Sequence, residues 1–132
     1  MSGWVELPSG ARVRGRRMAD RPDEPADLLL ALAGGPLPTW EVRRIVWPDF
    51  GLPADPADAV AALREALRRA RAGQRVEVAC HGGRGRTGTA LAALAVLDGM
   101  DPAEAVPWVR RVYHRRAVET PGQKRWVRSL SP

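Results

Sequence analysis

The sequence predicts an α/β domain with a central mixed, mainly parallel sheet flanked by helices. Short apolar runs alternate with helical patterns over the first part of the chain, and helical patterns alone follow in the last part. A Cys-x5-Arg segment connects the last predicted strand to the helix after it. With 132 residues, the chain is long enough to bury a hydrophobic core, so residues 1–132 are expected to form a single domain.

Strands are expected mostly in the first half. Two short apolar runs flank the turn residues Pro8-Ser9-Gly10, a pattern typical of two strands joined by a turn. A third run, residues 27–33, fits either a buried strand or a helical turn. The polar, proline-bearing residues 16–26 are expected to form a surface loop. The predicted strands cover residues 4–7, 12–15, 41–47 and 75–79.

Four helices are expected, and three of their starts carry capping signals. Asp55 followed by Pro56 is a favourable helix start, apolar residues then recur at helical spacing, and Gly73 provides a stop. Asp101 followed by Pro102 begins another helix in the same way, and Thr120 caps the last. The remaining predicted helices cover residues 87–97, 101–113 and 120–130.

Composition narrows the class of partner. The formal net charge of +6 suits an anionic partner such as nucleic acid, acidic lipid or a phosphorylated substrate. Aromatic residues are too scarce for a base-stacking platform, so nucleic-acid binding is not expected. No apolar run approaches the ~20 residues of a membrane span, and the first residues lack a signal-peptide pattern. The only cysteine favours a reducing compartment, and we expect a cytoplasmic monomer.

The glycine-rich segment at residues 76–92 supports two interpretations. Gly83, Gly85 and Gly88 have the G-x-G-x-x-G spacing of a dinucleotide-binding loop. That site needs a second strand carrying an acid about 20 residues after the glycines. Asp98 and Asp101 lie at about that distance, but Asp101 begins a predicted helix and no strand pattern follows. The dinucleotide interpretation is therefore disfavoured.

The second interpretation is a phosphate-binding loop that also serves a nucleophile. Cys80 follows a strand, and the glycines after it let successive backbone N–H groups point inward as an anion nest. The start of the next helix and the planar guanidinium of Arg86 add positive charge, which binds phosphate oxygens and stabilises a thiolate. Thr87 is expected to donate a hydrogen bond to the sulfur. The expected phosphate loop consists of His81, Gly82, Gly83, Arg84, Gly85 and Arg86.

Three motifs in order resemble those of the cysteine-based protein tyrosine and dual-specificity phosphatase superfamily, particularly its small single-domain members. Residues 80–87 match its Cys-x5-Arg-Ser/Thr signature, residues 47–53 (WPDFGLP) resemble its general-acid loop, and residues 119–123 (ETPGQ) are similar to its water-positioning segment. The resemblance implies a phosphomonoester hydrolase that needs neither metal nor cofactor and acts on phosphotyrosine in proteins through a phosphocysteine. It makes Cys80 the nucleophile, Asp49 the general acid and Gln123 the residue that positions water.

Several features keep other interpretations open. Ala79 stands where most members have a histidine before the catalytic cysteine, so we expect a less acidic thiol, and a catalytically weak phosphate-binding module remains an alternative. His81 and Arg84 make the loop unusually basic, as in phosphoinositide phosphatases. The overall basic charge also fits an RNA 5′-phosphatase. Thr120 and Gln123 have the spacing of a capping box, which is a purely structural reason for the glutamine.

Overall fold

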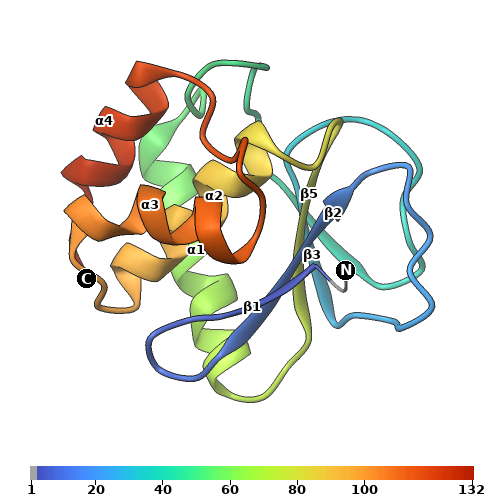
Figure 1. The fold of residues 1–132 in the computed structure, drawn as a ribbon. Helices are drawn as coiled ribbons and strands as arrows, with labels where there is room; N and C mark the ends of the chain where they lie inside the picture. The colour runs from blue at the N-terminus through green and yellow to red at the C-terminus, as the bar shows by residue number, and fades with distance from the viewer. Residues whose placement is uncertain (1–2) are drawn as a thin grey trace.

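The computed structural model describes residues 3–132. Their strands form one sheet in the order β1-β2-β5-β3-β4, in which β1 is antiparallel to β2 and the other neighbours are parallel (Figure 1). The strands are β1 (Trp4–Glu6), β2 (Arg12–Arg17), β3 (Leu28–Ala31), β4 (Glu41–Arg44) and β5 (Val76–Cys80). The predicted mixed, mainly parallel sheet is confirmed, and the ambiguous run at residues 27–33 contains a strand.

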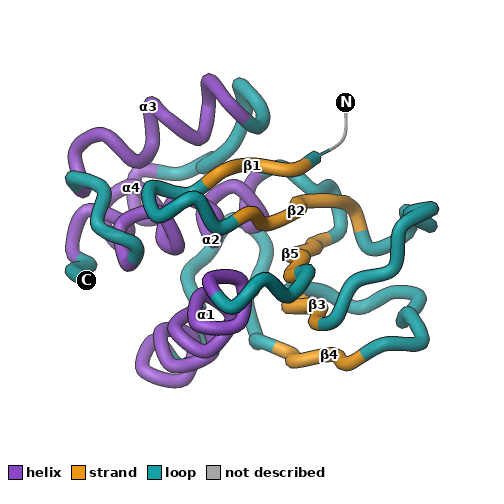
Figure 2. The backbone as a smooth tube through the Cα atoms, turned by 90° about the horizontal axis from the view of Figure 1, so that it is seen from below, coloured by secondary structure: helices purple, strands orange, loops and turns teal. Residues whose placement is uncertain are grey.

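The helices lie together on one side of the sheet (Figures 1 and 2). They are α1 (Pro56–Arg71), α2 (Gly85–Leu97), α3 (Pro102–Val112) and α4 (Pro121–Ser129). Asp55, Asp101 and Thr120 cap three of them with their side chains, as expected. Every residue of α2 is buried, since this helix packs between the sheet and the other helices. It begins at Gly85, two residues earlier than predicted, so the phosphate loop merges directly into it.

Side-chain alternation along β5 assigns the two faces of the sheet. Val78 and Cys80 belong to the main core under the helices, whereas Ala79 packs in a smaller cluster on the other face with Met18 and Leu29. Loops rather than helices cover that second face, as Figure 2 shows. None of the helices in residues 3–132 has both the length and the apolar character needed to cross a bilayer.

A buried ionic network occupies the second face and corrects one prediction. Arg16 is the fifth residue of β2 rather than part of a surface loop, and it is buried. The carboxylate of Glu77, fully buried on β5, accepts hydrogen bonds from Arg14, Arg16 and the indole of Trp40 at 2.6–3.1 Å. Arg16 Nη1 also donates to the carbonyl of Arg17, at 2.9 Å, and so fixes the chain as it leaves β2. Arginine was expected at the surface, but a paired guanidinium can be buried.

One other boundary differs from expectation. The strand predicted over residues 41–47 ends at Arg44, although Ile45 still donates a backbone hydrogen bond to Ala31. The chain then leaves the sheet toward Pro48, which has no N–H to continue a ladder. After β5 the described chain contains only helices, so the strand–helix–strand unit required by a dinucleotide site is missing from residues 81–132.

Candidate active site

The phosphate loop begins where β5 delivers Cys80 to the edge of the sheet. The cysteine is 2% exposed, and its Sγ accepts a hydrogen bond from the backbone N–H of Gly83 at 3.2 Å. Gly83 has a φ of +69°, and a Cβ there would lie 2.9 Å from the backbone of Arg16 and Arg17. Only glycine therefore fits this turn of the loop, which aims an N–H at the sulfur.

Arg86 lies at the start of α2 with its guanidinium held by backbone. Its Nη1 donates to the carbonyl oxygens of Leu32, at 3.2 Å, and Trp47, at 2.9 Å. The side chain is almost fully buried, yet Nε makes no hydrogen bond to any described residue and lies 3.5 Å from Asp49 Oδ1. The group is thus oriented, and its Nε–H is not used in a hydrogen bond, an arrangement that suits recognition of an oxyanion.

The segment at residues 47–53 forms a tight loop that presents Asp49. The N–H of Gly51 donates to the carbonyl of Pro48 at 3.0 Å, and the indole of Trp47 donates to the carbonyl of Gly51 at 2.8 Å. Trp47 is itself buried edge-on against Trp126 of α4, with ring centroids 5.4 Å apart. The loop therefore rests on the core while the carboxylate of Asp49 remains accessible.

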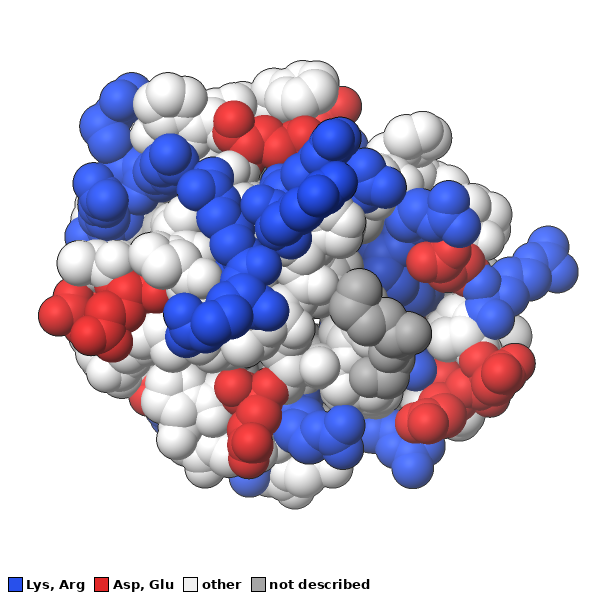
Figure 3. Space-filling view, in the orientation of Figure 1, with Lys and Arg blue, Asp and Glu red and all other residues white. Residues whose placement is uncertain are grey.

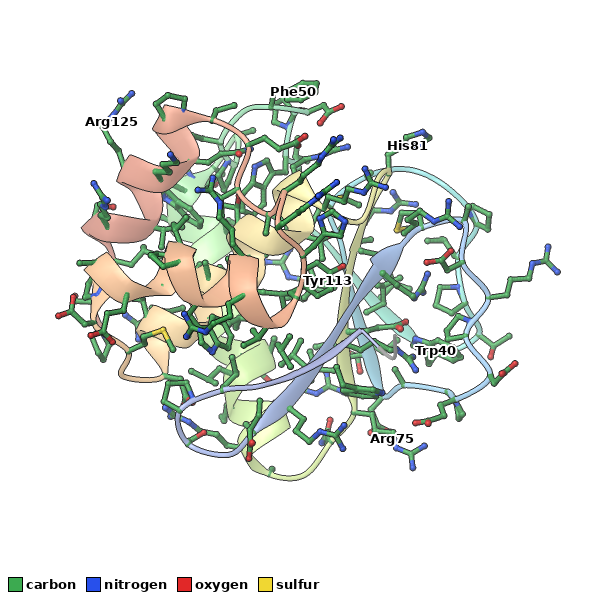
Figure 4. The ribbon with its side chains drawn as sticks, in the orientation of Figure 1. Trp40, Phe50, Arg75, His81, Tyr113 and Arg125 are labelled. Carbon is green, nitrogen blue, oxygen red and sulfur yellow. The ribbon has the colours of Figure 1, made fainter. Side chains whose placement is uncertain are left out.

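These segments enclose a pocket of about 390 Å³ at the carboxyl end of β5. Figure 4 shows Phe50 and His81 at this same end of the molecule. A larger hollow of about 680 Å³, which includes Glu24 and Arg75, lies at the opposite end of β5 and has no nucleophilic sulfur in its wall. The smaller pocket brings together Arg17, Asp49, Phe50, Cys80, His81, Gly82, Arg84, Gly85, Arg86 and Glu119.

Three of these residues were not singled out from the sequence as binding residues. Arg17 reaches the pocket because it pairs with Cys80 in the β2–β5 register, which only the sheet topology reveals. Phe50 follows Asp49 directly and could have been proposed from that position. Glu119 lies against the start of α2, where a Cβ at Gly85 would collide with its carboxylate. Among residues 3–132, no three His, Cys, Asp or Glu side chains gather in a metal-binding cluster.

Two predicted contacts take a different form. The hydroxyl of Thr87 is buried and has no hydrogen-bond partner in the described chain, so the expected bond to the Cys80 sulfur is not formed. Gln123 is fully buried in a complete capping box with Thr120. Its Oε1 accepts from the backbone N–H of Glu119 and Thr120, and its Nε2 donates to the carbonyl of Gly51 at 3.1 Å. Both ends of the amide are therefore occupied, and its role toward water stays a prediction.

Comparison with known proteins assigns the chain to a family. The model of the protein-tyrosine phosphatase family matches residues 38–121, a range that contains the acid loop, the phosphate loop and the start of the 119–123 segment. Tyrosine-protein phosphatase 1 of Caenorhabditis elegans is 33% identical over 94 residues, which are 66% of this chain and 9% of that protein. The chain thus spans about a tenth of the length of this relative.

Solved structures with the same fold are also phosphatases. The active form of Tk-PTP is 26% identical, with a TM-score of 0.63 over 80% of this chain and 78% of that one. PTPMT1, solved in complex with PI(5)P, is 17% identical and shares the fold, with a TM-score of 0.66 over 96% of this chain and 92% of that one.

Proposed function

The chain belongs to the protein-tyrosine phosphatase family, and from that premise we propose that it is a metal-independent phosphomonoester hydrolase that acts on phosphotyrosine in proteins. We propose that residues 1–132 work as one phosphatase domain, monomeric and cytoplasmic. The observation that carries the proposal is the pocket itself, where the buried sulfur of Cys80 accepts an N–H and Arg86 keeps Nε free beside the carboxylate of Asp49.

In the first step, the Cys80 thiolate attacks phosphorus and forms the S–P bond while the bond to the leaving oxygen breaks. Asp49 donates its proton to that oxygen, which leaves as the tyrosine hydroxyl. Arg86 and the N–H groups of residues 81–86 hold the equatorial oxygens as charge spreads over them. The 3.5 Å between Asp49 and Arg86 supports this division, since both side chains reach one phosphoryl-sized volume.

In the second step, water attacks phosphorus, the S–P bond breaks, and Asp49 takes a proton from that water. Inorganic phosphate is released and the thiolate is regenerated, so the cycle consumes one water molecule for each ester hydrolysed. The family resemblance assigns Gln123 to orient this water, which would require its amide to release Gly51.

Replacement of the nucleophile tests the proposal. Cys80→Ser should abolish hydrolysis of para-nitrophenyl phosphate while it keeps binding of vanadate, because the loop amides and Arg86 remain. An unchanged circular dichroism spectrum and melting temperature would show that the fold is intact. Full activity of the Cys80→Ser protein would contradict the proposed function.

A second candidate substrate, a phosphoinositide, is favoured by the basic rim of the pocket. Arg84 lines the pocket and, with Arg115 and Arg116, has no ion-pair partner within the described residues. These residues surround His114, whose pKa is lowered by partial burial and then by the three neighbouring positive charges. Figure 3 shows a band of basic side chains across the face of the molecule that is turned toward the viewer in Figure 1. Such a cluster suits a ligand with more than one phosphate.

A substrate panel separates these candidates. Phosphate release is measured from a phosphotyrosine peptide, a polyphosphorylated phosphoinositide headgroup and a 5′-phosphorylated RNA. Arg84→Ala should weaken release from the headgroup more than from the peptide if the rim selects polyanions. Arg125→Ala is the matched control, because Figure 4 shows Arg125 on α4, away from the pocket. No release from any substrate would support a phosphate-binding module instead.

A further inference from the structure

Tyr113, the residue that ends α3, connects this helix to the phosphate loop. Its hydroxyl donates a hydrogen bond of 2.5 Å to the carbonyl oxygen of Gly83. Figure 4 shows the side chain between α3 and the sheet, directed toward the strands. The contact joins residues that are 30 positions apart in the sequence, so the loop is held from outside its own segment.

Gly15 of β2 makes room for the tyrosine ring. A Cβ at this position would lie 2.6 Å from three atoms of Tyr113, namely Cε1, Cζ and the hydroxyl oxygen. The ring therefore lies against the strand where the side chain is missing. This close packing fixes the direction of the hydroxyl.

Gly83 is the residue through which the tyrosine reaches the sulfur. Its carbonyl accepts from Tyr113, and its N–H donates to Cys80 Sγ at 3.2 Å. Glycine can adopt many backbone conformations, and Gly83 has a φ of +69°, in the left-handed region. The orientation of its N–H therefore depends on the contacts that hold the residue in this conformation. Ala79, the neighbour of the cysteine in β5, has no polar side chain that could share this task.

We propose that Tyr113 is a positioning residue that holds the Gly83 N–H against the Cys80 sulfur and thereby stabilises the thiolate form of the nucleophile. The inference rests on the proposed function, in which that thiolate attacks phosphorus. Tyr113 acts through Gly83 and does not line the pocket itself. The bond that it holds in place, from the Gly83 N–H to the thiolate, has a charged acceptor and belongs to a class of hydrogen bond stronger than one between neutral groups.

The tyrosine remains a neutral donor throughout the range in which a thiol titrates. Burial, followed by the negative charges of Cys80 and Asp20, raises the pKa of Tyr113 well above its ordinary value of 10.0. The other charged or titratable groups around the sulfur stay in place when the tyrosine hydroxyl is removed. They are Arg17, Asp49, His81, Arg84, Arg86 and Glu119.

The pH dependence of cysteine alkylation tests the inference without any substrate. Because Cys80 is the only cysteine, iodoacetamide incorporation reports a single thiol. Tyr113→Phe keeps the ring against Gly15 and removes only the hydroxyl. We expect the pH midpoint of alkylation to rise by about one unit, corresponding to a roughly tenfold smaller thiolate fraction below the midpoint. The ascending limb of kcat/KM against pH should move by the same amount.

Two further variants separate this role from general damage. Gly15→Ala lies on β2 outside the pocket, and it should reproduce the shift because its Cβ displaces the tyrosine ring. Val112→Ala, at the exposed neighbouring position, should leave the midpoint unchanged. Superimposable alkylation profiles for the wild-type and Tyr113→Phe proteins would overturn the inference alone. A wild-type midpoint at the ordinary ~8.5 of a free thiol would instead count against the proposed function.

Discussion

The amide of Gln123 donates a hydrogen bond of 3.1 Å to the carbonyl of Gly51, which also accepts from the indole of Trp47 at 2.8 Å. One backbone oxygen of the acid loop is thus held from two sides, by the buried core and by the start of α4. Asp49 is two residues away on the same loop. The position of the proposed general acid therefore depends on a residue that lies 72 positions after Gly51 in the chain.

The first prediction separates the two roles of Gln123. Gln123→Ala leaves the backbone N–H groups of Glu119 and Thr120 without their acceptor and leaves the Gly51 carbonyl with the Trp47 indole alone, so it should destabilise the fold by about 1–3 kcal/mol and lower kcat. If the residue acts by holding the acid loop, its effect on kcat should disappear in an Asp49→Asn background, as measured by a double-mutant cycle.

Gln74→Ala is the control, because Gln74 is exposed and lines the hollow at the end of β5 opposite Cys80. A burst of released alcohol followed by slow turnover in Gln123→Ala would contradict the loop-holding role. It would support water positioning, since a phosphocysteine would then accumulate.

The second prediction concerns leaving-group protonation. Asp49→Asn should lower kcat for a phosphotyrosine peptide by about 10²–10⁴, the usual contribution of a general acid. The loss should be much smaller for an ester whose alcohol is a strong acid, because such a leaving group departs without a proton. The descending limb of the pH profile should also vanish. Equal losses for both esters would contradict the assignment of Asp49.

The parts of the site that lie within one continuous segment could be predicted from the sequence. Cys80 and Arg86 are fixed relative to each other by a strand, a loop and a helix that are adjacent in the chain, and the fold class followed from the same alternation. Gln123 was correctly expected in a capping box for the same reason.

Residues that reach the site by tertiary packing were not predictable in this way. Arg17 depends on the register of β2 against β5, and Tyr113 depends on a missing side chain at Gly15. Arg16 was misassigned to the surface because its buried partner, Glu77, is 61 positions away. Pairings at such separations leave no periodic signal in one sequence.

The third prediction uses the buried network of the second face. Burial opposes ionisation of Glu77, but hydrogen bonds and charges from Arg16 and Arg14 outweigh it, so its pKa lies below the ordinary 4.5. Because the folded pKa is depressed, this group stabilises the fold above about pH 4.5 and the contribution is lost as pH falls through the folded pKa. Glu77→Gln should cost about 3–5 kcal/mol at neutral pH, with two buried arginines left unpaired.

The measurement is urea unfolding of both proteins between pH 7 and pH 3. The difference in unfolding free energy should narrow toward the acid end. Glu65→Gln, which removes an exposed carboxylate paired with Arg68, is the control and should change little. A difference that stays constant with pH would contradict the ionised state of Glu77.

The fourth prediction concerns Phe50, which has a left-handed backbone with φ of 59° and a side chain that is 60% exposed. Glycine relieves roughly 1–2 kcal/mol of backbone strain but also increases the entropy of the unfolded chain. Phe50→Gly should therefore leave the melting temperature almost unchanged. Its kcat/KM for aryl phosphates should fall, because the ring lines the pocket.

Leu52→Gly provides the comparison on the same loop. Leu52 is half-exposed and does not have a positive φ, so glycine there brings no relief of strain and should lower the melting temperature. A comparable loss of stability in both variants would show that the conformation of Phe50 is not strained.

The loop cover of the second face has a practical consequence. Asp23 and Glu24 are exposed on it, and Glu24 belongs to the hollow beside Arg75, at the end of β5 opposite Cys80. The length of β5 keeps this point about 13 Å or more from the thiol. A fluorescent or affinity tag inserted between Asp23 and Glu24 would thus monitor or immobilise the protein while its chemistry proceeds undisturbed.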